Sequence, residues 1–173
     1  METIVLAGGC FWCTEAIFAS LRGVSGVIPG YSGGTIDDPS YNQVSSGESG
    51  HAESVKITFD PNIISLDKLL YVFFKLHDPT TLNQQGADHG TQYRSAIFYE
   101  NKEQMEIAET ALNVAQKEHR DKIVTEITPY KNFFPAEESH KQYYLKNQGN
   151  TYCTLVIDPK IQKLKREFSD LVA

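Results

Sequence analysis

The order of predicted elements along the chain indicates an α+β fold. Short, apolar, β-branched runs typical of strands are interspersed with longer segments of helical periodicity. The chain has 173 residues, of which 40% are hydrophobic and 22% are charged, a composition that suits one folded domain with a sizeable core. We therefore expect a single catalytic or binding domain over residues 1–173, built as one sheet with helices mainly on one face.

Elements of the N-terminal half follow from side-chain alternation and from glycine. Residues 3–7 (TIVLA) predict a buried strand that Gly8 and Gly9 end, and residues 10–21 predict a helix. The glycine-rich segment 23–34 is expected to be mostly turn, and residues 37–40 (DDPS) predict a further turn. Residues 53–59 alternate between apolar and polar faces, which predicts a strand.

Elements of the C-terminal half are predicted in the same way. Ser65 can cap a helix whose apolar stripe consists of Leu66, Leu69, Leu70 and Phe73. Residues 77–90 form a loop of a length that is usually functional or disordered. The remaining pattern predicts a strand at 93–99, a helix at 102–119, a strand at 123–127, a short helix at 136–146, a Gly/Asn-rich loop reaching Cys153, and a surface helix at 159–171.

Charge and hydropathy exclude several classes of function. The net charge of −6 comes from 16 Lys and Arg against 22 Asp and Glu, which argues against a nucleic-acid-binding surface. No apolar run approaches the roughly 18 residues of a membrane span, and no signal peptide is visible. The three cysteines are too few for a disulfide scaffold, so we expect a chain of the reducing cytoplasm with metal-binding, reactive or buried thiols.

Cys10 is the best candidate nucleophile. It lies where a predicted strand gives way to a predicted helix, and the free N–H groups of a helix N-terminus should lower the pKa of a thiol there. Phe11 and the only tryptophan, Trp12, follow it directly. The alternative is a buried cysteine followed by two core aromatics.

Cys10 and Cys13 also form a C-x-x-C pair, which has two further interpretations. One is a thioredoxin-like redox pair, although an aromatic pair between the cysteines is unusual for that motif. The other is half of a zinc site, but the chain has neither a second C-x-x-C nor an H-x₃₋₅-H pair. We therefore expect no metal site.

Glu53 is the best candidate acid. It shares a strand face with apolar residues, where burial should raise its pKa and make it a proton donor near neutral pH. As the first residue of the strand, it could instead point to solvent. Tyr41, Tyr93 and Tyr152 lie in or beside polar loop stretches, where side chains commonly serve binding, while His51 receives no role.

Several ordered motifs carry a resemblance to a known family. Residues 9–15 (GCFWCTE) resemble the active-site signature of peptide methionine sulfoxide reductase A. The resemblance continues through GYSGG at 30–34, DPSY at 38–41, SGESGHAE at 46–53, HDPTTLNQQGADHGTQYRS at 77–95 and GNTYC at 149–153. It covers roughly residues 4–159.

The resemblance implies a two-layer, ferredoxin-like sandwich and a specific reaction. It implies thiol-dependent reduction of methionine S-sulfoxide, free or in proteins, since methionine sulfoxide is repaired by one enzyme for each sulfoxide epimer. It further implies that no metal or organic cofactor is needed and that thioredoxin or another dithiol recycles the enzyme. Nothing in the sequence requires more than a monomer.

The resemblance implies a role at the reacting centre for each residue that matches a position of the family's motifs. Cys10 would attack the sulfoxide sulfur, and Glu53 would give a proton to its oxygen. Tyr41 and Tyr93 would hydrogen-bond that oxygen, and Asp88 would support the same site. Together these residues would leave Cys10 as a sulfenic acid.

The substrate pocket and the second thiol are carried over likewise. Phe11 and Trp12 would wall an apolar pocket for the S-methyl group, with Tyr152 at its border. Family members often have two cysteines near the C-terminus, whereas this chain has only Cys153, which predicts a Cys10–Cys153 disulfide. Cys13 occupies a position where the family has glycine or cysteine, so a relay through Cys13 stays open. The non-family alternatives are a thioredoxin-like oxidoreductase and a non-catalytic module that binds oxidised-methionine peptides.

Overall fold

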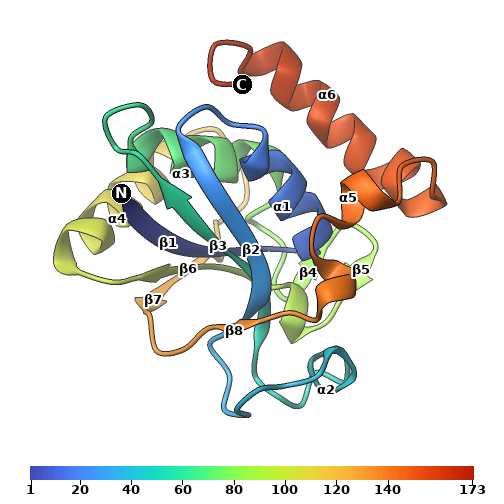
Figure 1. Cartoon of the computed structure of the whole chain (residues 1–173). Helices are drawn as coiled ribbons and strands as arrows, with labels where there is room; N and C mark the ends of the chain where they lie inside the picture. The colour runs from blue at the N-terminus through green and yellow to red at the C-terminus, as the bar shows by residue number, and fades with distance from the viewer.

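A six-stranded mixed sheet forms the centre of the structure, a computed structural model that describes residues 1–173 (Figure 1). The strand order is β7-β6-β1-β3-β2-β8, and only β6 and β7 pair in parallel. The strands are β1 (Glu2–Gly8), β2 (Val24–Ser32), β3 (Ala52–Phe59), β6 (Ser95–Tyr99), β7 (Glu126–Pro129) and β8 (Phe134–Pro135). A separate ribbon pairs β4 (Gln84–Gln85) with β5 (Asp88–His89).

Helices pack against one face of this sheet (Figure 1). The α-helices are α1 (Phe11–Ala19), α2 (Tyr41–Ser45), α3 (Leu66–Leu76), α4 (Lys102–Gln116), α5 (Tyr143–Lys146) and α6 (Asp158–Glu167). Three short segments complete the list, the 3₁₀ turns η1 (Thr91–Tyr93) and η2 (Glu138–His140) and the π-helical η3 (Cys153–Ile157). The expected α+β class with helices on one face is confirmed.

The alternation of side chains along each strand divides the core in two. On the helix side, Ile4 and Leu6 of β1 join a cluster of 31 buried residues that draws on α1, α3, α4 and α6. On the other side, Val5 and Ala7 join a cluster of 5 buried residues covered by Tyr130 and Phe133. Because β1 is buried on both faces, it reads as a continuous apolar run and was the easiest strand to predict.

The glycine-rich segment 23–34 is a long strand rather than mostly turn, so that prediction is wrong. Its residues pair with β3 as β2, and pairing with a buried neighbour outweighs the low strand propensity of glycine. Glycine is sterically required at position 30, since a Cβ there would lie 2.5 Å from the Phe134 carbonyl oxygen. Glycine therefore permits β8 to add to the sheet edge.

Boundaries elsewhere differ from the predictions. The strand expected at 93–99 begins at Ser95, with Tyr93 in η1, and the strand expected at 123–127 is β7, which begins at Glu126. The helix expected at 136–146 is two short pieces, because Gln142 has a left-handed backbone with φ 53° that interrupts it. The predicted loop at 77–90 carries the β4–β5 ribbon.

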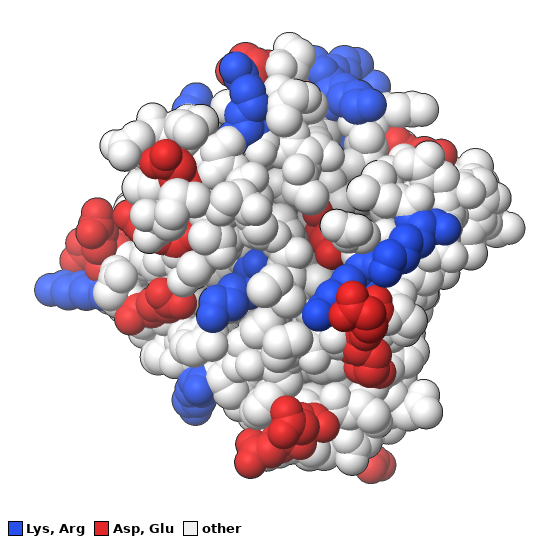
Figure 2. All heavy atoms as spheres, viewed as in Figure 1, with Lys and Arg blue, Asp and Glu red and all other residues white.

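The face drawn in Figure 2 carries no broad basic patch. Its Lys and Arg side chains are scattered among Asp and Glu, in places directly beside them. None of the helices combines the length and the apolar character needed to cross a bilayer.

Candidate active site

Cys10 lies at the turn that joins β1 to α1. It is the N-cap residue of α1, has an extended backbone, and is 8% exposed. The preceding Gly9 has φ 91°, and a Cβ there would lie 2.6 Å from the Gln85 side chain. Only glycine fits this turn, which presents the Cys10 thiol at the helix N-terminus.

Glu53 of β3 lies beside this thiol. Its side chain is 2% exposed, and its Oε1 accepts a hydrogen bond of 3.1 Å from the Phe11 N–H. Burial raises the pKa of Glu53 to about 8, although the Phe11 N–H opposes that shift. The carboxyl is therefore buried rather than turned to solvent, and it is mostly protonated at pH 7.

The pKa of Cys10 shifts in the direction opposite to the one expected. Burial raises the pKa of the Cys10 thiol well above its usual value, with further contributions from Cys13 and from the Glu53 charge. The lowering effect of the helix N-terminus comes only from the Trp12 N–H, because the Phe11 N–H is bound to Glu53. The hydrogen bond from Cys10 lowers the pKa of Cys13.

The two aromatics that follow Cys10 have different surroundings. Phe11 is buried and contacts Tyr31, with ring centroids 5.6 Å apart. Trp12 is half-buried and stacks on Tyr143, with centroids 3.7 Å apart and an interplanar angle of 6°. Its Nε1–H donates to His140 Nδ1 at 3.1 Å. Phe11 is thus almost wholly buried next to Cys10, whereas Trp12 is partly exposed beside it.

Tyr41 and Tyr93 lie in the electrostatic reach of Glu53. Burial raises the pKa of both phenols, and the Glu53 charge is the next contribution for each. The remaining predicted residues meet on the side of Cys13, where the Tyr152 hydroxyl donates to Asp88 Oδ2 at 2.9 Å and lies 3.8 Å from Cys13 Sγ. The predicted residues therefore surround one small region from α1, β3, α2, η1, β5 and the start of η3.

Cys153 is placed differently from the expectation. It is buried and begins the π-helical segment η3, so the prediction of a flexible Gly/Asn-rich loop at this residue is wrong. Burial raises the pKa of Cys153, followed by the charges of Asp158 and Cys13. All three cysteines are free. Of the other two thiols, Cys13 is the one whose charge acts on Cys153.

Two residues of the chain segment after β8 complete the site and were missed by sequence reasoning. Glu137 accepts hydrogen bonds from the Tyr31 hydroxyl at 3.0 Å and from the Tyr41 N–H at 3.1 Å. His140 lies among Phe11, Trp12 and Tyr41, with its ring 4.6 Å from that of Tyr41. The only sequence signal was the concentration of aromatic and acidic residues in 130–144, which does not reveal a contact across the chain.

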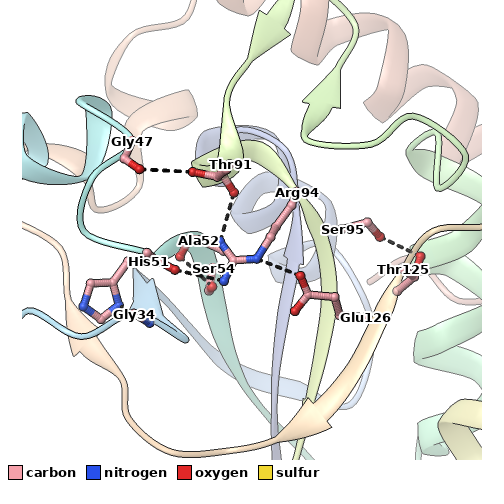
Figure 3. Close-up of polar contacts among 11 residues, drawn as sticks. Gly34, Gly47, His51, Ala52, Ser54, Thr91, Arg94, Ser95, Thr125 and Glu126 are labelled. Atoms are coloured by element: carbon pink, nitrogen blue, oxygen red, sulfur yellow. Dashed lines mark hydrogen bonds and ion pairs between the residues drawn. The ribbon is translucent and has the colours of Figure 1, made fainter.

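A polar network around Arg94 connects segments that adjoin β3 and η1, the elements of Glu53 and Tyr93 (Figure 3). The Arg94 guanidinium donates to the carbonyl oxygens of Thr91 and Gly50, each at 3.0 Å, and pairs with Glu126 at 3.1 Å. It thereby joins η1, the loop before β3 and the edge strand β7. The site residues thus rest on a connected framework rather than on isolated loops.

The structure contains no group of three or more His, Cys, Asp or Glu side chains arranged to hold a metal ion. The chemistry that the site can perform with its own groups is proton donation by Glu53 and nucleophilic attack by a thiol.

Comparisons with known proteins agree with the resemblance carried by the motifs. The profile of the peptide methionine sulfoxide reductase family matches residues 2–171. The peptide methionine sulfoxide reductase MsrA of Sulfolobus acidocaldarius is 49% identical over 170 residues, which are 98% of this chain and 97% of that protein. The reduced form of Mxr1 from Saccharomyces cerevisiae has a TM-score of 0.84 and 36% identity, covering 88% of each chain.

A further solved structure, Mxr1 from Saccharomyces cerevisiae in complex with Trx2, has a TM-score of 0.60 and 28% identity, covering 82% of this chain and 84% of that chain. These likenesses do not favour the thioredoxin-like oxidoreductase suggested by the C-x-x-C pair. Profile, identity and fold agree over nearly the whole length, and the chain belongs to the peptide methionine sulfoxide reductase family.

Proposed function

We propose that this chain reduces the S epimer of methionine sulfoxide, free or in proteins, with Cys10 as nucleophile and Glu53 as acid. The observation that carries the proposal is a carboxyl with a pKa of about 8 held beside a buried thiol. A sulfoxide sulfur is a poor electrophile until its oxygen accepts a proton. Glu53 holds that proton at neutral pH, and Cys10 is positioned to attack as the proton transfers.

The surrounding side chains suit both the polar oxygen and the apolar methyl group of a methyl sulfoxide. Tyr41 and Tyr93 stay protonated because their pKa values are raised, so their hydroxyls can donate to the sulfoxide oxygen. Phe11 and Trp12 offer an apolar wall to the methyl group, with Tyr152 at its border. Asp88 orients Tyr152 through their 2.9 Å hydrogen bond.

The reaction balances without any cofactor. The Cys10 thiol takes the sulfoxide oxygen, which leaves methionine and a Cys10 sulfenic acid. A second thiol then condenses with the sulfenic acid to give a disulfide and water. A dithiol reduces that disulfide by exchange and returns the enzyme to its starting state.

Cys153 is the proposed second thiol, with Cys13 as the less favoured one. Cys153 is the single cysteine of the C-terminal half, and forming the Cys10–Cys153 bond requires η3 to open because Cys153 is buried there. Cys13 supports a relay instead, since it contacts Cys10 and lies 3.8 Å from the hydroxyl of Tyr152, the neighbour of Cys153. The Mxr1–Trx2 complex supports thioredoxin as the reducing partner.

The type of α+β fold, the domain organisation, the oligomeric state and the cellular compartment are proposed together with the function. The order β6-β1-β3-β2, with neighbours antiparallel and α1 and α3 as crossovers, supports a ferredoxin-like core. We propose that residues 1–173 form one catalytic domain that acts as a monomer, because one chain supplies every residue named. Free thiols support a reducing compartment such as the cytoplasm.

The test is turnover of a methionine sulfoxide substrate with dithiothreitol, each epimer being supplied separately. We expect reduction of the S epimer only, and we expect Cys10→Ser to abolish it. Undiminished turnover by Cys10→Ser would overturn the assignment. Binding of oxidised peptides without any turnover by the unaltered enzyme would indicate a binding module instead.

A further inference from the structure

Glu15 joins the active-site helix to a distant part of the chain. It lies one turn after Trp12 on α1 and is 5% exposed. Its Oε2 accepts a hydrogen bond of 3.1 Å from the Gln142 N–H, and the Tyr143 N–H also lowers its pKa against the effect of burial. A buried carboxylate needs such partners, so the contact fixes the start of α5 against α1.

The segment that Glu15 holds is only partly buried and is fixed by a few specific contacts, among them the hydrogen bond from Tyr144 to Asp158. None of the residues of η2 or α5 is buried, and Leu145 is 67% exposed. Ala16 and Ala19 of α1 and Leu145 line a cavity of about 250 Å³. The left-handed backbone of Gln142, with φ 53°, is a conformation that a residue other than glycine adopts at a cost. The hydrogen bond to Glu15 offsets that cost at the same residue.

The segment also carries the ring that covers Trp12. Tyr143 follows Gln142 directly and lies flat on the indole, with centroids 3.7 Å apart and an interplanar angle of 6°. Two residues before Gln142, His140 accepts the indole N–H at 3.1 Å. Both contacts to Trp12 thus come from residues 140–143, the segment whose backbone Glu15 binds at Gln142.

We propose that Glu15 is a positioning residue, which holds residues 140–143 so that Tyr143 and His140 fix the Trp12 wall of the substrate pocket. The expected change in substrate affinity rests on the function proposed above, whereas the contact between Glu15 and residues 140–143 does not. Glu15 does not touch the reacting atoms, so it acts on substrate affinity through Trp12 rather than on the chemical step.

Trp12 is the only tryptophan, so the fluorescence of the full-length enzyme reports how well Tyr143 and His140 cover the indole. Glu15→Ala should make the indole more accessible to acrylamide quenching. It should also raise KM for a sulfoxide substrate about two- to tenfold, the range an aromatic pair contributes, while kcat is kept. Glu15→Gln keeps an oxygen that accepts the Gln142 N–H and should restore most of the wild-type behaviour. Glu109→Ala, an exposed helical glutamate of α4, is the matched control and should change nothing.

A double-mutant cycle separates positioning from general destabilisation. Tyr143→Ala alone should reproduce the quenching of Glu15→Ala, and the double variant should show little further change, because both act through one contact. Additive effects, or unchanged quenching in Glu15→Ala, would overturn the proposal. The quenching experiment needs no turnover, so inactivity of the unaltered enzyme would refute the proposed function and leave the contact intact.

Discussion

The β1–α1–β3 region and the chain segment 134–157 contribute to the same site with opposite physical character. In the first region, Cys10 and Glu53 are buried, and β1 and β3 pair over five positions in the middle of the sheet. In the second, β8 has two residues, η2 and α5 have no buried residue, and a residue with positive φ separates them. Local opening therefore costs more in the first region than in the second.

This difference matches what each region has to do in the proposed cycle. Attack on the sulfoxide requires a fixed distance between thiol, acid and substrate, which a paired and buried framework provides. Disulfide formation requires a second thiol to approach Cys10 and then to become available to another protein. A weakly packed segment is suited to that movement, although Cys153 itself is buried at its end.

The largest expected effect separates the two regions by function. Cys153→Ser should release one equivalent of methionine in a single turnover and then stop, because the sulfenic acid forms but is not converted to a disulfide that thioredoxin can reduce. Two quantities should be measured for Cys153→Ser and for Cys13→Ser: the methionine released in the first turnover, and the steady-state rate of turnover with thioredoxin. Surviving thioredoxin-supported turnover in Cys153→Ser, with loss in Cys13→Ser, would make Cys13 the resolving residue.

The acid in the buried region should have the next largest effect. Glu53→Gln removes the proton donor but keeps the shape of the side chain, so the single-turnover rate should fall on the order of 10²- to 10⁴-fold. Rapid-quench measurement of methionine release isolates this step from recycling. A rate close to that of the wild type would exclude Glu53 as the acid.

The pH dependence of that step follows from the same carboxyl. The pKa of Glu53 is raised to about 8, so the donor is protonated below that pH and is lost above it. Relative to the rate of Glu53→Gln, which keeps the titration of the thiol, the single-turnover rate should be constant up to about pH 7 and then fall about tenfold for each pH unit well above the pKa. Rate profiles of both proteins between pH 6 and 10 would test this.

Glu53 also links pH to the free energy of unfolding. Its folded pKa lies above the ordinary value of 4.5, so its contribution is fully present below pH 4.5 and is lost as pH rises through about 8. The loss has a slope of at most about 1.4 kcal/mol per pH unit. Denaturant unfolding at pH 5 and pH 8 should show this slope in the wild type and a smaller one in Glu53→Gln.

The smallest expected effect is that of Leu145→Ala, which serves to compare packing in the two regions. Ile57→Ala in β3 should lower the free energy of unfolding by about 2–5 kcal/mol, because Ile57 is fully buried in the main core. Leu145→Ala in α5 should change it by less than about 0.5 kcal/mol, because that side chain is largely exposed. A comparable loss for both variants would contradict the contrast drawn between the regions.

Sequence reasoning succeeded where one face of an element is buried locally. The alternation in residues 53–59 placed Glu53 on the apolar face, and the stripe of Leu66, Leu69 and Leu70 defined α3, because burial there has the period of the element itself. The motifs then supplied the residues that meet at Cys10 and the family to which the chain belongs.

Sequence reasoning failed where distant partners decide the structure. The glycines of β2 predict turn, whereas its stability as a strand comes from pairing with β3 and β8. Glu137 and His140 were missed because their partners, Tyr31 and Trp12, lie more than a hundred residues away along the chain. The thiol pKa was expected to fall because helix position is visible in sequence, whereas the burial that raises it is not.

Both outer strands of the sheet end in proline, at Pro129 in β7 and Pro135 in β8. Proline lacks the N–H that a further strand would need, and both strands are short. Both features disfavour the addition of a further chain segment to either edge, which suits an enzyme whose proposed substrates include oxidised proteins.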